Sequence, residues 1–358
     1  MKSTFKKNIV SIQSIKPAFY YLLAALFLLF EMGVQSSPGV MANNMMKELQ
    51  VGAGGFGLAM GCYFFSYTLM EIPAGLLYDR FPAKPLLMMA VLVCSIGAYV
   101  FSLGHGLWLL ALARFLTGLG SSFAFIGVLV VANQWFPARY FALLVGIAQW
   151  VAAMGAMAGE MPLAYWVKAY GWRHASVLLS LIGLVLLALI FMLMRSKPVS
   201  SHSSVVSPYQ SLCNILRNKQ TYFIAIYAFT SWSPIVLFAE LWGVPYLIVR
   251  QHISNVASAE YGVFIWIGLA LMSPFLGFIS DKIQQRRLFL VLCSAIGLTA
   301  AVLLLYSPVR GHVSLVVIML MIGVASAGQI LCFALVRDHF PKQDLAVAIG
   351  VINMAVVV

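Results

Sequence analysis

Two carboxylates in this sequence lie inside long apolar runs, where a charged side chain is costly. Glu31 and Glu240 each come shortly before a Gly-Val pair. If such a run crosses a bilayer, an ionisable group at its centre costs about 2.5–3.5 kcal/mol, so it needs a partner, a water-filled cavity or a function. Burial disfavours the charged form, so a carboxylate there can bind and release protons as water reaches it. Glu31 and Glu240 are therefore predicted proton-coupling residues; the alternatives are pairing within the bundle, or an outer-interface place for Glu240.

Further polar residues in these runs are predicted to line a cavity. Gln35 lies about one helical turn after Glu31 and shares its face. Tyr63 and Tyr67 begin a row at four-residue spacing that Glu71 continues. Such a row forms one polar line along a helix, although packing between helices explains the two tyrosines equally well.

Arg114 is the one basic residue inside an apolar run. A guanidinium cannot be neutralised by losing its proton, so Arg114 must face a cavity or a carboxylate. Glu160, three helical turns from Gln149 on one face, is either its counter-charge or an interface residue. The predicted substrate-cavity residues are Gln35, Tyr63, Tyr67, Arg114, Gln149 and Glu160.

One short pattern, a glycine followed four residues later by an aspartate and then by a basic residue, occurs twice in the chain. The two copies are 202 residues apart, and each comes where an apolar run ends. Glycine permits close approach of two helices, and the aspartate can accept hydrogen bonds from the start of a neighbouring helix. The basic residues are expected to form salt bridges between helices, so each copy is predicted to belong to an inner gate. The gate residues are Gly75, Asp79, Arg80 and Lys84 in the first copy and Gly277, Asp281, Lys282 and Arg286 in the second.

The elements that must position these residues are membrane-spanning helices. The chain of 358 residues is 62% hydrophobic and only 9% charged, against roughly 25% charged in soluble domains. Ten runs reach the length of roughly 20 residues that a bilayer requires, and an eleventh from Leu345 to Val358 is shorter, so the chain is expected to be truncated there. The ten predicted spans are 17–42, 53–77, 85–104, 106–133, 141–165, 174–194, 221–247, 260–279, 288–306 and 313–335.

The positive charge follows membrane topology. With the N-terminus inside, sixteen Lys and Arg residues fall in inner segments and five in outer segments, as the positive-inside rule requires. The net charge of +12 is thus no sign of nucleic-acid binding. The repeat predicts an all-α polytopic protein of two pseudo-symmetric bundles, with an N-terminal six-helix bundle at 1–195, a cytoplasmic linker at 196–220 and an incomplete C-terminal bundle at 221–358.

The repeated loop resembles the signature loop of the major facilitator superfamily, which recurs between its second and third and its eighth and ninth helices. Arg114-Phe115-x-x-Gly118-x-Gly120 is similar to the fourth-helix motif of that superfamily, and Gly171-Trp172-Arg173 to the entry of its sixth helix. Pro82 and Ala83 depart from the usual loop. Within the superfamily, the segments around Glu31 and Glu240 resemble phagosomal nutrient transporters of intracellular bacteria and, more weakly, lysosomal dipeptide transporters.

This resemblance implies a secondary transporter of a small polar metabolite, an amino acid or small peptide first, in proton symport by alternating access. The alternatives are a transporter of organic anions such as carboxylates or sugar acids, and a non-transporting nutrient sensor on the same fold. No nucleotide-binding loop or hydrolase motif is present in the sequence, so neither a pump nor an enzyme is expected. The expected partners are substrate, protons and lipid, for a monomer without cofactor or metal in a bacterial inner membrane.

Overall fold

A computed structural model of the chain describes residues 12–197, 208–251, 255–306, 311–341 and 344–357. All regular structure in these ranges is helical. The first half of the chain forms α1 (Ile12–Leu49), α2 (Ala53–Arg80), α3 (Ala83–Ser102), α4 (Leu107–Trp135), η1 (Ala138–Tyr140) and α5 (Phe141–Leu193). The second half forms α6 (Pro208–Arg217), α7 (Lys219–Pro234), η3 (Ile235–Trp242), α8 (Gly243–Gln251), α9 (Asn255–Ile283), α10 (Arg286–Tyr306), α11 (His312–Ser326), η4 (Ala327–Gln329), α12 (Ile330–His339) and α13 (Leu345–Val357).

Nine helical segments in the described ranges are long and apolar enough to cross a membrane. The all-α, multi-pass membrane architecture expected from the sequence is confirmed. Nine is one fewer than predicted, because the run at 53–77 folds as helix α2 but does not reach the required mean hydropathy; its glycines, tyrosines and Glu71 dilute the apolar residues. The outer helices expose apolar side chains, as lipid contact requires; on α10 these include Leu288, Val291, Leu292, Leu298, Val302 and Leu305.

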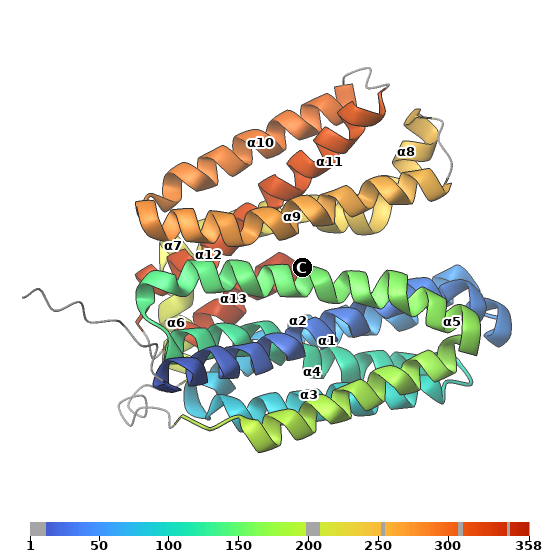
Figure 1. Cartoon of the computed structure of the whole chain (residues 1–358), viewed down its shortest axis with the longest axis horizontal. Helices are drawn as coiled ribbons and strands as arrows, with labels where there is room; N and C mark the ends of the chain where they lie inside the picture. Colours follow the sequence, from blue (N-terminus) through green and yellow to red (C-terminus); the bar gives the residue numbers. More distant parts are fainter. Residues whose placement is uncertain (1–11, 198–207, 252–254, 307–310, 342–343, 358) are drawn as a thin grey trace, which may run out of the picture.

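Helices α1 to α5 pack together, and α7 to α13 form the other half of the molecule (Figure 1). The two halves meet mainly along two pairs of helices, α5 with α9 and α2 with α13, and α12 also contacts α5. Each pair joins a helix from one half to a helix from the other. The middle of the predicted linker, residues 198–207, lies outside the described residues, and α6 follows it.

The fifth and sixth apolar runs are joined through a single glycine. Helical structure extends from Phe141 to Leu193 and is broken at Gly171, whose φ of 84° lies in the left-handed region. Glycine adopts this conformation without steric cost. Directly after it, Arg173 pairs with Glu48 at 2.7 Å and Trp172 donates to the same carboxylate at 2.6 Å, which fixes α5 at this break against the C-terminal end of α1.

The seventh run is also interrupted. After Pro234, which ends α7, the backbone takes a π-helical form from Ile235 to Trp242 before α8 begins. Proline removes a backbone donor and π-helical turns are often found at functional sites. Glu240 lies in this π-helical segment.

Close packing of α1 against α5 depends on glycine. A Cβ on Gly155 would collide with the carbonyl of Leu29, and one on Gly159 with the carbonyl of Gly33. Small residues at four-residue spacing allow two helix backbones this close within a membrane.

We therefore expect Gly155→Ala to destabilise the chain and Gly57→Ala not to. Both substitutions improve helix propensity by about 1 kcal/mol, but Gly57 has no atom within 4 Å of its Cβ position, whereas at Gly155 the backbones must separate, at about 1–3 kcal/mol. The thermal unfolding midpoint of each purified variant in detergent measures the difference. An equal or higher midpoint for Gly155→Ala than for Gly57→Ala would contradict this packing account.

Candidate functional site

A proline in α1 prepares the first part of the site. Pro38 has no N–H, so the carbonyl of Val34, four residues earlier, has no helical donor. Two side chains donate to this carbonyl instead: the Ser37 hydroxyl at 2.9 Å and Arg114 Nη1 of α4 at 3.1 Å, while Arg114 Nη2 donates to the Gln35 carbonyl at 3.3 Å. The sequence predicts that Arg114 faces a cavity or a carboxylate; in the structure it donates to backbone carbonyls and lines a cavity.

Four residues from three helices form what we call the polar cluster: Glu31 and Gln35 of α1, Tyr63 of α2 and Arg114 of α4. The Tyr63 hydroxyl lies 2.6 Å from Glu31 Oε1 and 3.1 Å from Gln35 Oε1. The Arg114 guanidinium stacks on the Tyr63 ring at 4.4 Å from its centroid, a cation–π geometry. Tyr63 therefore connects the carboxylate to the guanidinium.

The polar cluster is buried, since Glu31, Tyr63 and Arg114 are each 3% exposed or less. No carboxylate of the described side chains lies within 4 Å of Arg114, and its Nε has no partner there. A narrow cavity beside Arg114 reaches between α1, α3, α4 and α5, lined by Val34, Ser37, Pro38, Ala98, Phe101, Arg114, Thr117, Ser176 and Leu179.

The tyrosine row continues the polar contacts into the other half of the molecule. The rings of Tyr63 and Tyr67 stack with centroids 5.8 Å apart. Asn353 of α13 donates to the Tyr67 hydroxyl at 3.2 Å and to Glu71 Oε1 at 2.6 Å. These contacts cross between the halves at the α2–α13 pair.

Three other predicted site residues have no described contact with the polar cluster. Gln149 is buried in α5 at 6% exposure. The structure describes the backbone of Glu160, in α5, and that of Glu240, in η3, but it does not describe their side chains. The pairing of Arg114 with Glu160 therefore stays a prediction.

The first copy of the repeated loop contacts the start of α13. Asp79 Oδ1 accepts from the Ala346 amide and Oδ2 from the Val347 amide, both at 3.1 Å. Gly75 lies so close to Ala346 that a Cβ would collide with its backbone. The aspartate thus caps a helix of the other half, where the positive end of the helix dipole favours an anion.

The basic residues of this first copy do not form the ion pairs that the sequence predicts. Arg80 is exposed, and Lys84 donates to the Phe191 carbonyl of its own half at 2.7 Å. No salt bridge of this copy is present among the described residues. Pro82 sets the N-terminus of α3, so Lys84 lies in its first turn and turns back toward the end of α5.

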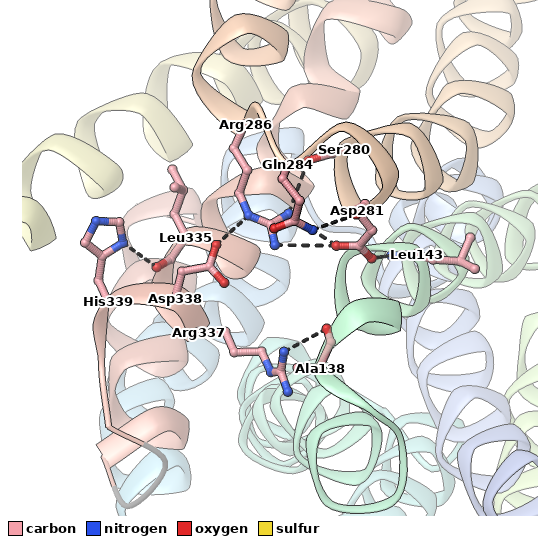
Figure 2. A network of polar contacts seen from close by, with 10 residues as sticks. All are labelled: Ala138, Leu143, Ser280, Asp281, Gln284, Arg286, Leu335, Arg337, Asp338 and His339. Atoms are coloured by element: carbon pink, nitrogen blue, oxygen red, sulfur yellow. Dashed lines mark hydrogen bonds and ion pairs between the residues drawn. The ribbon is translucent and has the colours of Figure 1, made fainter.

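The second copy makes the corresponding contact with α5 (Figure 2). Asp281 Oδ2 accepts from the Leu143 amide at 3.0 Å, and Gly277 approaches Ala142 too closely for a Cβ. Here an ionic network is present, because Arg286 pairs with Asp281 at 3.4 Å and with Asp338 at 2.5 Å. Lys282 is exposed.

Two more sets of contacts lie near these loops. One joins α12 to the first half, and the other joins α6, the helix after the linker, to the residue before α13. Arg337 of α12 donates to Asn133 Oδ1 at 3.0 Å and to the Ala138 carbonyl at 2.8 Å. Ser211 of α6 donates to Asp344 at 2.7 Å, just before α13 begins.

Sequence reasoning missed several of these partners. Asn353, Asp338 and Asp344 were not among the predicted site residues, and Glu71 was noted only as part of the tyrosine row. For Asn353 a signal existed, since it is the one polar side chain in the apolar run from Leu345 to Val358. Asp338 lies near the end of α12 and Asp344 directly before α13, and nothing local in the sequence marks their partners.

Comparison with known proteins agrees with the architecture. Residues 23–358 match the model of the Major Facilitator Superfamily. A hexuronate transporter of Bacillus subtilis (strain 168) is 25% identical over 74% of this chain and 65% of its own length. The sialic acid transporter NanX of Escherichia coli (strain K12) is 22% identical over 61% of this chain and 53% of its own length, so the chain spans less than two-thirds of either relative.

Solved structures show the same fold. The crystal structure of the E. coli fucose:proton symporter FucP superimposes with a TM-score of 0.69 at 17% identity, covering 95% of this chain and 88% of that one. At this identity the likeness shows the fold alone.

Asp79→Ala should loosen the start of α13, since it leaves the Ala346 and Val347 amides without their acceptor. Hydrogen bonds to a charged group contribute about 1.5–3 kcal/mol, so amide exchange at Ala346 and Val347 should accelerate about 10- to 100-fold. Hydrogen–deuterium exchange with mass spectrometry measures this, with Arg80→Ala at the exposed neighbour as the matched control. Unchanged exchange at these amides in Asp79→Ala would show that the cap does not hold α13.

Proposed function

This chain belongs to the Major Facilitator Superfamily, and from that premise we propose that it acts in secondary transport of a small organic anion, with sugar acids as the leading substrate class. Transport would proceed by alternating access, in which the two halves rock about a central site. The observation that carries the anion assignment is Arg114, a buried guanidinium in the polar cluster with no carboxylate within 4 Å among the described side chains.

A substrate carboxylate would complete this arrangement. A guanidinium offers five N–H donors in a planar fork that matches a carboxylate. Two nitrogens of Arg114 are each engaged with one carbonyl, and Nε has no partner among the described residues. The relatives named for hexuronate and sialic acid support the same chemistry, since both of those compounds are carboxylates.

Glu31 is the proposed proton-binding residue. It is buried at 2% exposure and touches the same tyrosine that stacks on Arg114. Proton binding at Glu31 would therefore change the charge next to Tyr63 and so affect Arg114, the residue proposed to hold the substrate. Glu240 remains the second candidate for proton coupling, on its position in the π-helical segment of the other half.

An amino acid or small peptide is the second substrate class, and one observation favours it. Glu31 and Arg114 provide opposite charges on either side of Tyr63, a pattern that suits a zwitterion. The relatives named above do not support this class, so it ranks below organic anions. Ligand binding without flux would point to a sensor on the same fold.

We further propose the topology that the charge distribution predicts: a cytoplasmic N-terminus, bundles at 1–195 and 221–358 joined by the linker at 196–220, and a monomer in a bacterial inner membrane. Cysteine accessibility tests the orientation, because Arg80→Cys and Lys282→Cys would react with an impermeant reagent only from the cytoplasmic side. Reaction of both from the outside would reverse the topology.

Arg114→Lys should weaken exchange of the anion while leaving the fold intact. Lysine keeps the charge but loses the planar fork of donors. The substrate concentration that half-saturates counterflow should therefore rise about tenfold or more, in line with about 1.5–3 kcal/mol for a charged hydrogen bond. Counterflow of labelled glucuronate, galactarate, an amino acid and a dipeptide into proteoliposomes identifies the substrate class. Arg173→Lys, at the outer surface, is the matched control; wild-type half-saturation in Arg114→Lys would remove Arg114 from the site.

Glu31→Gln should abolish uptake driven by a pH gradient and spare passive exchange. The amide keeps the size of the side chain and can still accept a hydrogen bond from Tyr63, but it does not bind a proton in the pH range of the assay. Uptake into proteoliposomes with and without an imposed gradient separates the two activities, and Glu48→Gln at the outer end of α1 is the control. Normal gradient-driven uptake in Glu31→Gln would exclude Glu31 from coupling.

A further inference from the structure

Glu71 has an unusual place in the molecule. Its side chain is fully buried, at 0% exposure, on the face of α2 that meets α13. One carboxyl oxygen accepts from Asn353 at 2.6 Å, and the other has no partner among the described residues. The main chain of the two helices is tightly packed here, since a Cβ on Gly350 of α13 would collide with the Glu71 carbonyl.

The surroundings of Glu71 contain no cation among the described side chains. The titratable groups that act on it are Tyr67 of its own helix and Glu31 of α1. On the other side α13 presents the neutral Asn353, and α4 brings the apolar Ile126 to the same contact. A charge in such a position is costly unless it is paired, whereas the neutral acid is tolerated.

We propose that Glu71 is a proton-binding site located in the contact between the two halves, and that proton binding there favours the joined arrangement of α2 and α13. The site differs from Glu31, whose partners all belong to the first half. Asn353 is its positioning residue, because it reaches Glu71 and Tyr67 from the other half.

The direction of the effect follows from linkage. While α2 and α13 are joined, Glu71 is shielded from water and the neutral acid is the favoured form. When they separate, water reaches the carboxylate and stabilises its charge. The joined state therefore binds the proton better, so a low pH favours joining and a rising pH favours separation at this end.

This inference rests on an interlobe motion, which the proposed transport also requires, but it does not need the substrate to be an organic anion. A measurement of the distance between the halves therefore tests it without any flux. If anion counterflow fails while the pH-dependent distance change is present, the proposed substrate is wrong and this site stands.

Double electron–electron resonance between spin labels at Arg80→Cys and Lys282→Cys reports the separation of the two halves at their inner ends. Both positions are exposed, and the partly accessible Cys62 and Cys213 are replaced by serine in the chain, which is reconstituted in liposomes. On raising the pH from about 5.5 to about 8.5 we expect the ratio of separated to joined molecules to rise about 5- to 150-fold, the usual range of coupling between sites.

Glu71→Gln should abolish this pH dependence, and Glu48→Gln, a control at the C-terminal end of α1 whose side chain is half exposed, should retain it. Asn353→Asp, a second variant, places another carboxyl group opposite Glu71 and should increase the separated population at high pH more than in the wild type. A wild-type pH response in Glu71→Gln, or its loss in Glu48→Gln, would overturn the assignment, as would a wild-type chain whose distances do not change with pH.

Discussion

The structure depends on one interaction made twice: an aspartate at the end of a helix in one half accepts backbone hydrogen bonds from the first turn of a helix in the other half. Asp79 does this for α13 and Asp281 for α5. The anion suits the positive end of the helix dipole, and a glycine four residues earlier lets the backbones approach. Both joints lie where membrane-spanning segments end, so the parts of the helices farther along can diverge while these ends stay together.

A second constraint determines the polar cluster. In a bilayer, backbone carbonyls must find donors within the protein. Pro38 takes the backbone donor away from the Val34 carbonyl, and the Ser37 hydroxyl and Arg114 of α4 donate to it instead. The same contact holds the guanidinium against Tyr63 and close to the carboxylate that Tyr63 contacts. Thus a defect in one helix positions a cation that packing alone would exclude from the core.

The sequence predicted what depends on local pattern. Long apolar runs gave most of the spans, because span length is fixed by bilayer thickness, and the repeated Gly-to-Asp spacing anticipated aspartates at the starts of neighbouring helices. The sequence-based prediction failed for contacts between residues that are far apart in the chain. The ion pairs expected of Arg80 and Lys84 do not form in the described residues, and Asn353 meets Glu71 across 282 residues. No local signal encodes such pairings.

The contacts at the two joints, α5–α9 and α2–α13, differ in strength. This difference determines which joint is expected to separate first. At the α5–α9 joint, Arg286 holds Asp281 in place within the second half, and Arg337 of α12 donates across to Asn133 and the Ala138 carbonyl of the first half. The α2–α13 joint has the backbone cap, together with the contact of Asp344 with Ser211 in the helix that follows the linker. Because charge-assisted hydrogen bonds are the stronger kind, the α2–α13 joint is the one expected to part first. Glu71 and Asn353 lie on this weaker pair of helices, two turns from Asp79, so proton binding acts where the least free energy is needed to change the arrangement.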